Sequence, residues 1–140
     1  MKKYLVIGNP IEHSLSPQLH NYWFKQNNID AVYEKKQINE SDIKGIIAQM
    51  RIGEIEGINV TVPFKKSVIP FLDEHEVSRK VPSVNTIYKK KNKIIGTNTD
   101  ILGFKYALHH IKYKVKEKKF FILGAGGVTS SIIFALEQMQ

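Results

Sequence analysis

The chain of 140 residues contains no cysteine, which excludes a disulfide framework, a thiolate metal site and a cysteine nucleophile. It also lacks a long hydrophobic run. The apolar stretch at residues 4–7 is ended by Gly8-Asn9-Pro10, far short of the roughly 18 apolar residues that a membrane span needs. That stretch is also too short for the core of a signal peptide. We therefore expect a cytoplasmic protein with no membrane partner and no metal site.

Acidic residues are scarce, with 13 Asp and Glu against 21 Lys and Arg, which gives a formal net charge of +8. The lysines gather at residues 89–93 and 112–119. No RNA-recognition, KH, zinc-finger or helix-turn-helix pattern accompanies this charge. We interpret the lysine runs as a solvated turn and a solvated linker, and we expect no nucleic-acid partner. The positive field favours anionic small ligands.

The hydrophobic pattern alternates between strand and helix periods, which predicts an α/β fold. The predicted strands are residues 4–7, 31–38, 57–62 and 119–123, with a hairpin formed by 83–88 and 93–97. The predicted helices begin at Ser16, Ser41 and Val128, and two more cover 66–72 and 101–111. Ser16, before Pro17, and Ser41 are the expected helix caps. The expected apolar faces of the first two helices are formed by Leu19, Tyr22 and Trp23, and by Ile43, Ile46, Ile47 and Met50.

Residues 57–66 form the most informative stretch, because apolar and polar side chains alternate strictly along it. One face carries Ile58, Val60, Val62 and Phe64, and the other carries Asn59, Thr61 and Lys65. Asparagine is depleted in strands and proline cannot donate to a ladder, so Asn59 and Pro63 do not favour the sheet itself. The polar row predicts a grip on a small polyhydroxylated or carbonyl substrate. The alternative is an ordinary solvent-facing side of a strand.

A glycine loop lies between the last predicted strand and the last predicted helix, in the pattern Gly124-x-Gly126-x-x-Thr129. In this context the glycines allow a tight turn and a close approach of the backbone to a pyrophosphate at the helix N-terminus. A plain turn is the alternative. The residue that reads the ribose, about 20 positions further on, would lie beyond Gln140, so the loop does not distinguish NAD from NADP.

Five motifs, in order along the whole chain, resemble those of the shikimate dehydrogenase family. They are residues 8–17 with Ser14-Leu15-Ser16, residues 59–65, Ser83-Val84-Asn85-Thr86, residues 96–100, and Gly124-Ala125-Gly126-Gly127. Quinate-using relatives share the pattern. The chain departs from it in two places: the family usually has Gly-Ala where Pro82-Ser83 stands, and Gly where Ile101 stands.

The resemblance implies two parts of the chain. Residues 1–112 would form a substrate-binding α/β domain with a twisted, mixed, mostly parallel sheet. Residues 113–140 would form the first βα unit of an incomplete Rossmann domain. The remainder of the cofactor domain, and a late helix that completes the family's substrate site, have no counterpart in these residues.

The resemblance also implies a reaction and its residues. The reaction is the reversible reduction of 3-dehydroshikimate to shikimate, a step of aromatic amino acid biosynthesis, with NADPH as cofactor and NAD as the open alternative. Lys65 would donate the proton, and Asp100 would orient Lys65. The remaining expected residues bind substrate (Ser14, Ser16, Asn59, Thr61, Asn85, Thr99) or cofactor (Gly124, Ala125, Gly126, Gly127, Val128).

Some single residues have plainer interpretations. Ser16 and Asp100 could each be only a helix cap, and Lys65 could be one solvated lysine among many. The order of the motifs favours the catalytic role for Lys65 and Asp100. For the whole chain two alternatives stay open: a non-catalytic fragment or partner-dependent substrate-binding module, and a quinate/shikimate dehydrogenase. We expect the 140 residues alone to be inactive, and a homodimer is compatible with the resemblance.

Overall fold

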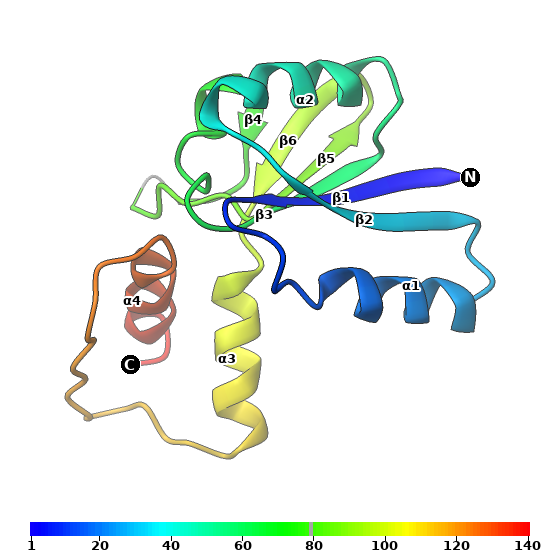
Figure 1. Ribbon diagram of the computed structural model, residues 1–140. Coiled ribbons are helices and arrows are strands. Elements are labelled where there is room, and N and C mark those ends of the chain that lie inside the picture. Colours follow the sequence, from blue (N-terminus) through cyan, green and yellow to red (C-terminus); the bar gives the residue numbers. More distant parts are fainter. Residues whose placement is uncertain (79) are drawn as a thin grey trace.

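The computed structural model describes residues 1–78 and 80–140, which form one six-stranded sheet and four α-helices (Figure 1). The strands lie in the order β2-β1-β3-β5-β6-β4. Their bounds are β1 Lys2–Gly8, β2 Ala31–Gln37, β3 Gly57–Val60, β4 Glu74–His75, β5 Thr86–Lys90 and β6 Lys93–Thr97. The pairs β1–β2, β1–β3 and β4–β6 are parallel, whereas β3–β5 and β5–β6 are antiparallel. The mixed, mostly parallel sheet is therefore confirmed.

The helices are α1 Ser16–Gln26, α2 Ile43–Arg51, α3 Asp100–His110 and α4 Thr129–Glu137, with short 3-10 turns at Glu40–Asp42 and Ile69–Phe71. Within the described residues, no helix has the length and hydrophobicity to cross a membrane. The 3-10 turn at Ile69–Phe71 replaces the helix predicted at 66–72, because Pro70 lacks the N–H that a longer helix would use.

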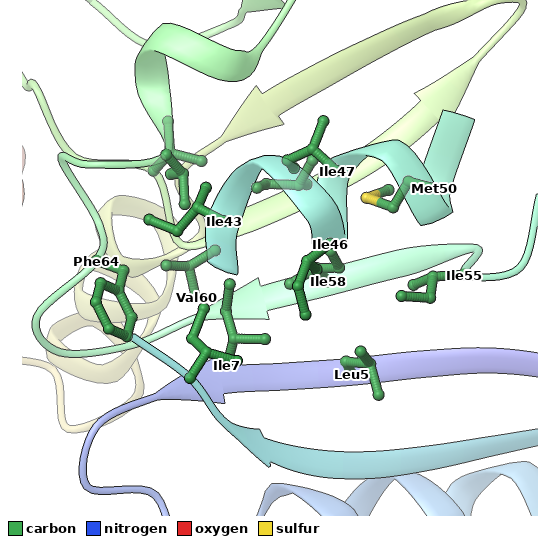
Figure 2. Packing of buried hydrophobic residues seen from close by; sticks show 14 of the residues in the cluster. Leu5, Ile7, Ile43, Ile46, Ile47, Met50, Ile55, Ile58, Val60 and Phe64 are labelled. Carbon is green, nitrogen blue, oxygen red and sulfur yellow. The ribbon is translucent and has the colours of Figure 1, made fainter. Parts of the chain in front are cut away.

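Helix α2 covers one face of the sheet and forms the main core with it (Figure 2). Its predicted apolar face is confirmed, since all four residues at the 3.6-residue period are buried, and they pack on alternate residues of the strands below, such as Leu5, Ile7, Ile58 and Val60. Each such side chain stabilises the fold by about 1.5–3 kcal/mol. The cap differs from the prediction. Asp42, and not Ser41, accepts a hydrogen bond, from the Asn39 N–H at 2.8 Å.

Helix α1 lies on the opposite face, over β1 and β2, but its predicted apolar face is wrong. Leu19, Tyr22 and Trp23 are exposed. The helix instead turns two aromatic rings to the sheet: His20 stacks on Tyr33 with ring centroids 4.2 Å apart, and Phe24 lies 5.5 Å from Tyr4. The spacing of hydrophobic residues does not predict contacts of this kind, because they involve a polar ring.

Strand β3 is shorter than predicted, because it ends at Val60 and the chain then leaves the sheet in a turn. Val62, expected on the buried face, is exposed. Pro63 explains the early end, since it has no N–H to donate to a neighbouring strand. The predicted hairpin is confirmed as β5 and β6, joined by the turn at Lys91-Asn92, but its first strand begins at Thr86 and not at residue 83.

Residues 119–123 do not form the predicted strand. Phe121 is 94% exposed and Leu123 is 99% exposed. A strand exists only through hydrogen bonds to a neighbour, and no described strand lies beside this segment. The helix that follows does form: α4 packs side by side with α3, away from the face that α2 covers (Figure 1), and it buries Ala135 and Leu136.

Candidate functional site

Lys65 and Asp100, which are 35 residues apart in the sequence, form an ion pair. Lys65 lies in the turn after β3 and Asp100 is the first residue of α3. The Lys65 Nζ is 2.7 Å from the Asp100 Oδ2, and the two side chains are only 12% and 24% exposed. Dissolved salt screens the attraction between two partly buried charges less than it screens a pair at the surface. The site therefore holds a positioned ammonium beside a carboxylate.

Asp100 is not a helix cap, and that alternative is wrong. Its two carboxylate oxygens accept hydrogen bonds from Lys65 and from the Asn85 Nδ2, the latter at 2.8 Å. The start of α3 is capped by Asn98, whose Oδ1 accepts the N–H groups of Asp100 and Ile101 at 2.9 and 3.3 Å. The Asp100 carboxylate is therefore bonded to Lys65 and Asn85 and not to the end of its own helix.

Asn85 joins the ion pair to its surroundings. Its Nδ2 also donates to the Thr99 Oγ1 at 2.9 Å, and its Oδ1 accepts from the Thr99 N–H at 2.9 Å. The Thr86 hydroxyl donates to the same Oδ1 at 3.0 Å. With its amide fixed at both ends, Asn85 has one orientation.

Asn59 extends this network across the sheet. Its Nδ2 donates to the Thr86 Oγ1 at 3.0 Å, and its Oδ1 accepts from the Tyr33 hydroxyl at 2.6 Å. Hydrogen bonds thus connect Tyr33, through Asn59, Thr86 and Asn85, to Asp100. The alternative of an ordinary solvent-facing strand side does not fit Asn59, which is half-buried and engaged on both sides.

Tyr33 belongs to this network, although no motif in the sequence predicts it as a site residue. It is buried on β2, and burial raises the pKa of its phenol to about 12, while hydrogen bonding from Ser16 acts in the opposite direction. The phenol therefore stays protonated and acts as a donor at neutral pH. Only its place on a predicted strand was visible in the sequence, because no spacing links residue 33 to residue 59.

Ser14 and Ser16 differ from the prediction in their local roles. Ser16 is the first residue of α1, with Leu15 at the cap position and no side-chain cap bond, so the interpretation of Ser16 as a cap is wrong. It is the Ser14 Oγ that accepts a backbone bond, from the Ser16 N–H at 3.3 Å. The Ser16 hydroxyl instead lies beside the Tyr33 phenol.

Thr61 stands at the end of β3, where its N–H donates to the Ile7 carbonyl at 2.9 Å. It lies so close to the turn after β1 that a Cβ on Gly8 would be 2.5 Å from the Thr61 Cγ2. Gly8 is required here, because any side chain would push Thr61 away. Among the predicted substrate residues, Thr61 is thus held by backbone packing and not by the side-chain network.

The glycine loop reaches the same site at one point only. Gly124, Ala125 and Gly126 are exposed, whereas a Cβ built on Gly127 would lie 3.7 Å from the Cδ of Lys65. Gly124 has φ +111°, a conformation that suits glycine alone. The loop leads directly into α4, and its exposed backbone leaves room for an anion such as a dinucleotide pyrophosphate, although the Thr129 N–H at the start of the helix donates to the Gly126 carbonyl at 3.1 Å. Among the residues that the structure describes, no group of three or more His, Asp and Glu could hold a metal ion.

Comparisons with known proteins point to one family. The model for the shikimate dehydrogenase substrate binding domain matches residues 6–87. A shikimate dehydrogenase (NADP(+)) of Pelagibacter ubique is 58% identical over an alignment of 140 positions, which covers 99% of this chain and 53% of that protein.

Solved structures agree. The crystal structure of shikimate dehydrogenase from Aquifex aeolicus superimposes with a TM-score of 0.92 at 38% identity, covering 99% of this chain and 53% of that one. The Thermus thermophilus shikimate 5-dehydrogenase in complex with shikimate gives a TM-score of 0.90 at 29% identity, with 99% and 53% covered. The chain therefore spans about half the length of the relatives it matches.

Proposed function

Because this chain belongs to the shikimate dehydrogenase family, we propose that it forms the substrate-binding half, and the first turn of the cofactor site, of an enzyme that interconverts 3-dehydroshikimate and shikimate with NADPH. The observation that carries the proposal is the Lys65–Asp100 pair at 2.7 Å, held by Asn85. The domain boundary near residue 112 is part of the same proposal.

Lys65 is the proton donor in this proposal. Reduction of a ketone adds a hydride to carbon and a proton to the oxygen, on which negative charge develops. A lysine ammonium both supplies the proton and stabilises that charge. Asp100 keeps the ammonium in one place, and it accepts a hydroxyl of the substrate with its remaining lone pairs.

The neutral side chains around the pair bind the substrate. Ser14 and Ser16 would hold its carboxylate, and the ring hydroxyls would meet Asn59, Thr61, Asn85 and Thr99. Tyr33 supports this set by fixing the amide of Asn59 at 2.6 Å. Partly buried groups of this kind reject analogues that lack a hydroxyl, because their own hydrogen bonds would be left unmade.

The glycine loop would hold the dinucleotide, with backbone N–H groups of Gly124, Ala125, Gly126, Gly127 and Val128 directed at the pyrophosphate. When bound, the nicotinamide supplies the hydride. NADP rather than NAD is favoured by the name of the Pelagibacter ubique relative.

A chimaera tests the proposal. Residues 1–140 are joined to the part of the Pelagibacter ubique relative that lies beyond the match, and NADPH oxidation with 3-dehydroshikimate is measured. Lys65→Ala should lower kcat by about 10²–10⁴-fold with little change in KM, as expected for loss of a general acid. The control is Lys66→Ala, which removes an exposed lysine one residue further on.

Near-normal kcat in Lys65→Ala would contradict the assigned role. Quinate, offered with NADP⁺ to the same chimaera in the reverse reaction, tests the dual-specificity alternative. Activity of the 140-residue chain by itself would also contradict the proposal, because ligands of a doubly wound sheet bind in a crevice between its halves.

A further inference from the structure

Ser83 belongs to none of the roles assigned above. It precedes Val84-Asn85 in the substrate motif, its side chain is fully buried, and its hydroxyl donates to the Gly127 carbonyl at 2.8 Å. The two residues are 44 positions apart. This bond therefore joins the substrate motif directly to the glycine loop.

A second buried amide completes the connection. The Asn98 Nδ2 donates to the Ser83 carbonyl at 2.7 Å and to the Ser131 Oγ at 2.9 Å. Asn98 and Ser131 are both buried, and among the described residues no buried side-chain nitrogen or oxygen lacks a partner. We call these three residues, Ser83, Asn98 and Ser131, the polar junction. It fastens the start of α4 to the start of α3.

The polar junction is also next to Lys65. The Val84 N–H, directly after Ser83, donates to the Lys65 carbonyl at 2.8 Å. Gly127, which Ser83 holds, lies against the stem of the Lys65 side chain. The same short stretch of chain thus determines the place of the proposed proton donor and of the last glycine in the loop.

The other hydrogen bonds that the described residues give the glycine loop are local, because the Thr129 N–H donates to the Gly126 carbonyl at 3.1 Å and the Thr129 hydroxyl to the Gly124 carbonyl at 3.4 Å. A Cβ added to Gly124 or Gly126 would meet no atom within 4 Å. A buried hydrogen bond fixes a backbone well, because breaking it leaves two polar groups without water. From this contrast we propose that Ser83 is a positioning residue, which holds the glycine loop over Lys65 and so sets the place of the cofactor relative to the Lys65–Asp100 pair.

Alanine at residue 83, the usual residue in the family pattern, gives a mild test, since it removes one oxygen and leaves the fold intact. In the 140-residue chain, hydrogen exchange is followed at the amides of Thr129 and Ile132, which donate to Gly126 and Val128. Ser83→Ala should speed both about 2- to 12-fold, the effect of one net hydrogen bond. Amides of β1 and α2 should keep their rates. Unchanged exchange at Thr129 and Ile132 would overturn the proposal.

The cofactor part of the inference rests on the proposed function and is tested in the chimaera. Ser83→Ala should raise KM for NADPH by about 2- to 12-fold and leave KM for 3-dehydroshikimate unchanged. Ser83→Cys, which restores the volume with a poor donor, should resemble alanine. The control is Ser130→Ala, beside Ser131, because the described residues show no side-chain hydrogen bond from Ser130.

The outcomes are distinguishable. An unchanged KM for NADPH in an active Ser83→Ala chimaera would overturn the cofactor role of Ser83. Full recovery in Ser83→Cys would overturn the hydrogen bond as its cause. An inactive unsubstituted chimaera would contradict the proposed function, while the exchange rates at Thr129 and Ile132 would still decide whether Ser83 holds the loop.

Discussion

The strands of the sheet and the segment at residues 119–123 both carry consecutive apolar side chains, yet the sheet buries most of its own and the segment leaves most of its own exposed. In the sheet and α2, Ile7, Ile43 and Ile58 are almost inaccessible to water. In the segment, Phe121 and Leu123 are almost fully exposed. A hydrophobic pattern therefore predicts only that a segment tends to form a strand or a helix. The strand or helix forms where another surface is present to pack against or pair with it.

The two regions also differ in how they are held. The sheet is held by a continuous apolar core and by its own strand pairing. Helix α4 is held by two buried apolar residues, Ala135 and Leu136, and by the hydrogen bonds of the polar junction. Because few contacts anchor α4, the loss of one should destabilise α4 locally and should change the free energy of unfolding of the whole fold little.

The largest expected contrast in stability comes from one substitution in each region. Ile43→Ala in α2 empties a fully buried position and should lower the free energy of unfolding by about 2–5 kcal/mol. Ile133→Ala in α4, a matched change at a partly exposed position, should cost less than about 1 kcal/mol. Urea unfolding followed by circular dichroism measures both. Equal costs would mean that α4 belongs to the same cooperative core.

Apart from the two-residue β4, which was not predicted, the strands and α2 were predictable from the sequence because their signal is periodic and local. Val60 and Ile58 alternate with polar residues, and Ile43 to Met50 follow the helical period. The packed side of α1 was not predictable, since it depends on His20 stacking on Tyr33, a contact between polar rings from two elements. The strand predicted at 119–123 does not form for the opposite reason: its local signal is present, but no strand of residues 1–78 and 80–140 lies beside it.

For the site, the motifs predicted which residues meet but not how they are arranged. Lys65 and Asp100 were expected together, and they do form a pair. Tyr33 and Ser83 were missed, because each acts through a hydrogen bond to a residue more than 20 positions away. Such partners carry no spacing signal. The catalytic and binding roles themselves stay predictions until the chimaera is assayed.

A smaller effect separates the two serines at the start of α1. Ser14→Ala removes the acceptor of the Ser16 N–H and should lower the free energy of unfolding by about 0.5–1.5 kcal/mol. Ser16→Ala should change it by less than about 0.5 kcal/mol, because the Tyr33 hydroxyl keeps its bond to Asn59. The midpoints of urea unfolding of the two variants show which serine contributes more to the free energy of unfolding. A larger loss in Ser16→Ala would return the capping role to Ser16.

The smallest expected effect on stability belongs to the exposed segment. Leu123 is 99% exposed, so Leu123→Lys removes no packing and should change the free energy of unfolding by less than about 0.5 kcal/mol. Its effect should appear in association instead, because contiguous exposed apolar residues such as Phe121 and Leu123 promote it. Sedimentation velocity should show less self-association in Leu123→Lys than in the unsubstituted chain. Leu19→Lys, the same substitution on the exposed side of α1, is the control and should leave association as it was. Loss of stability in Leu123→Lys would mean that residues 119–123 pack in solution, and the contrast between the two regions would then fail.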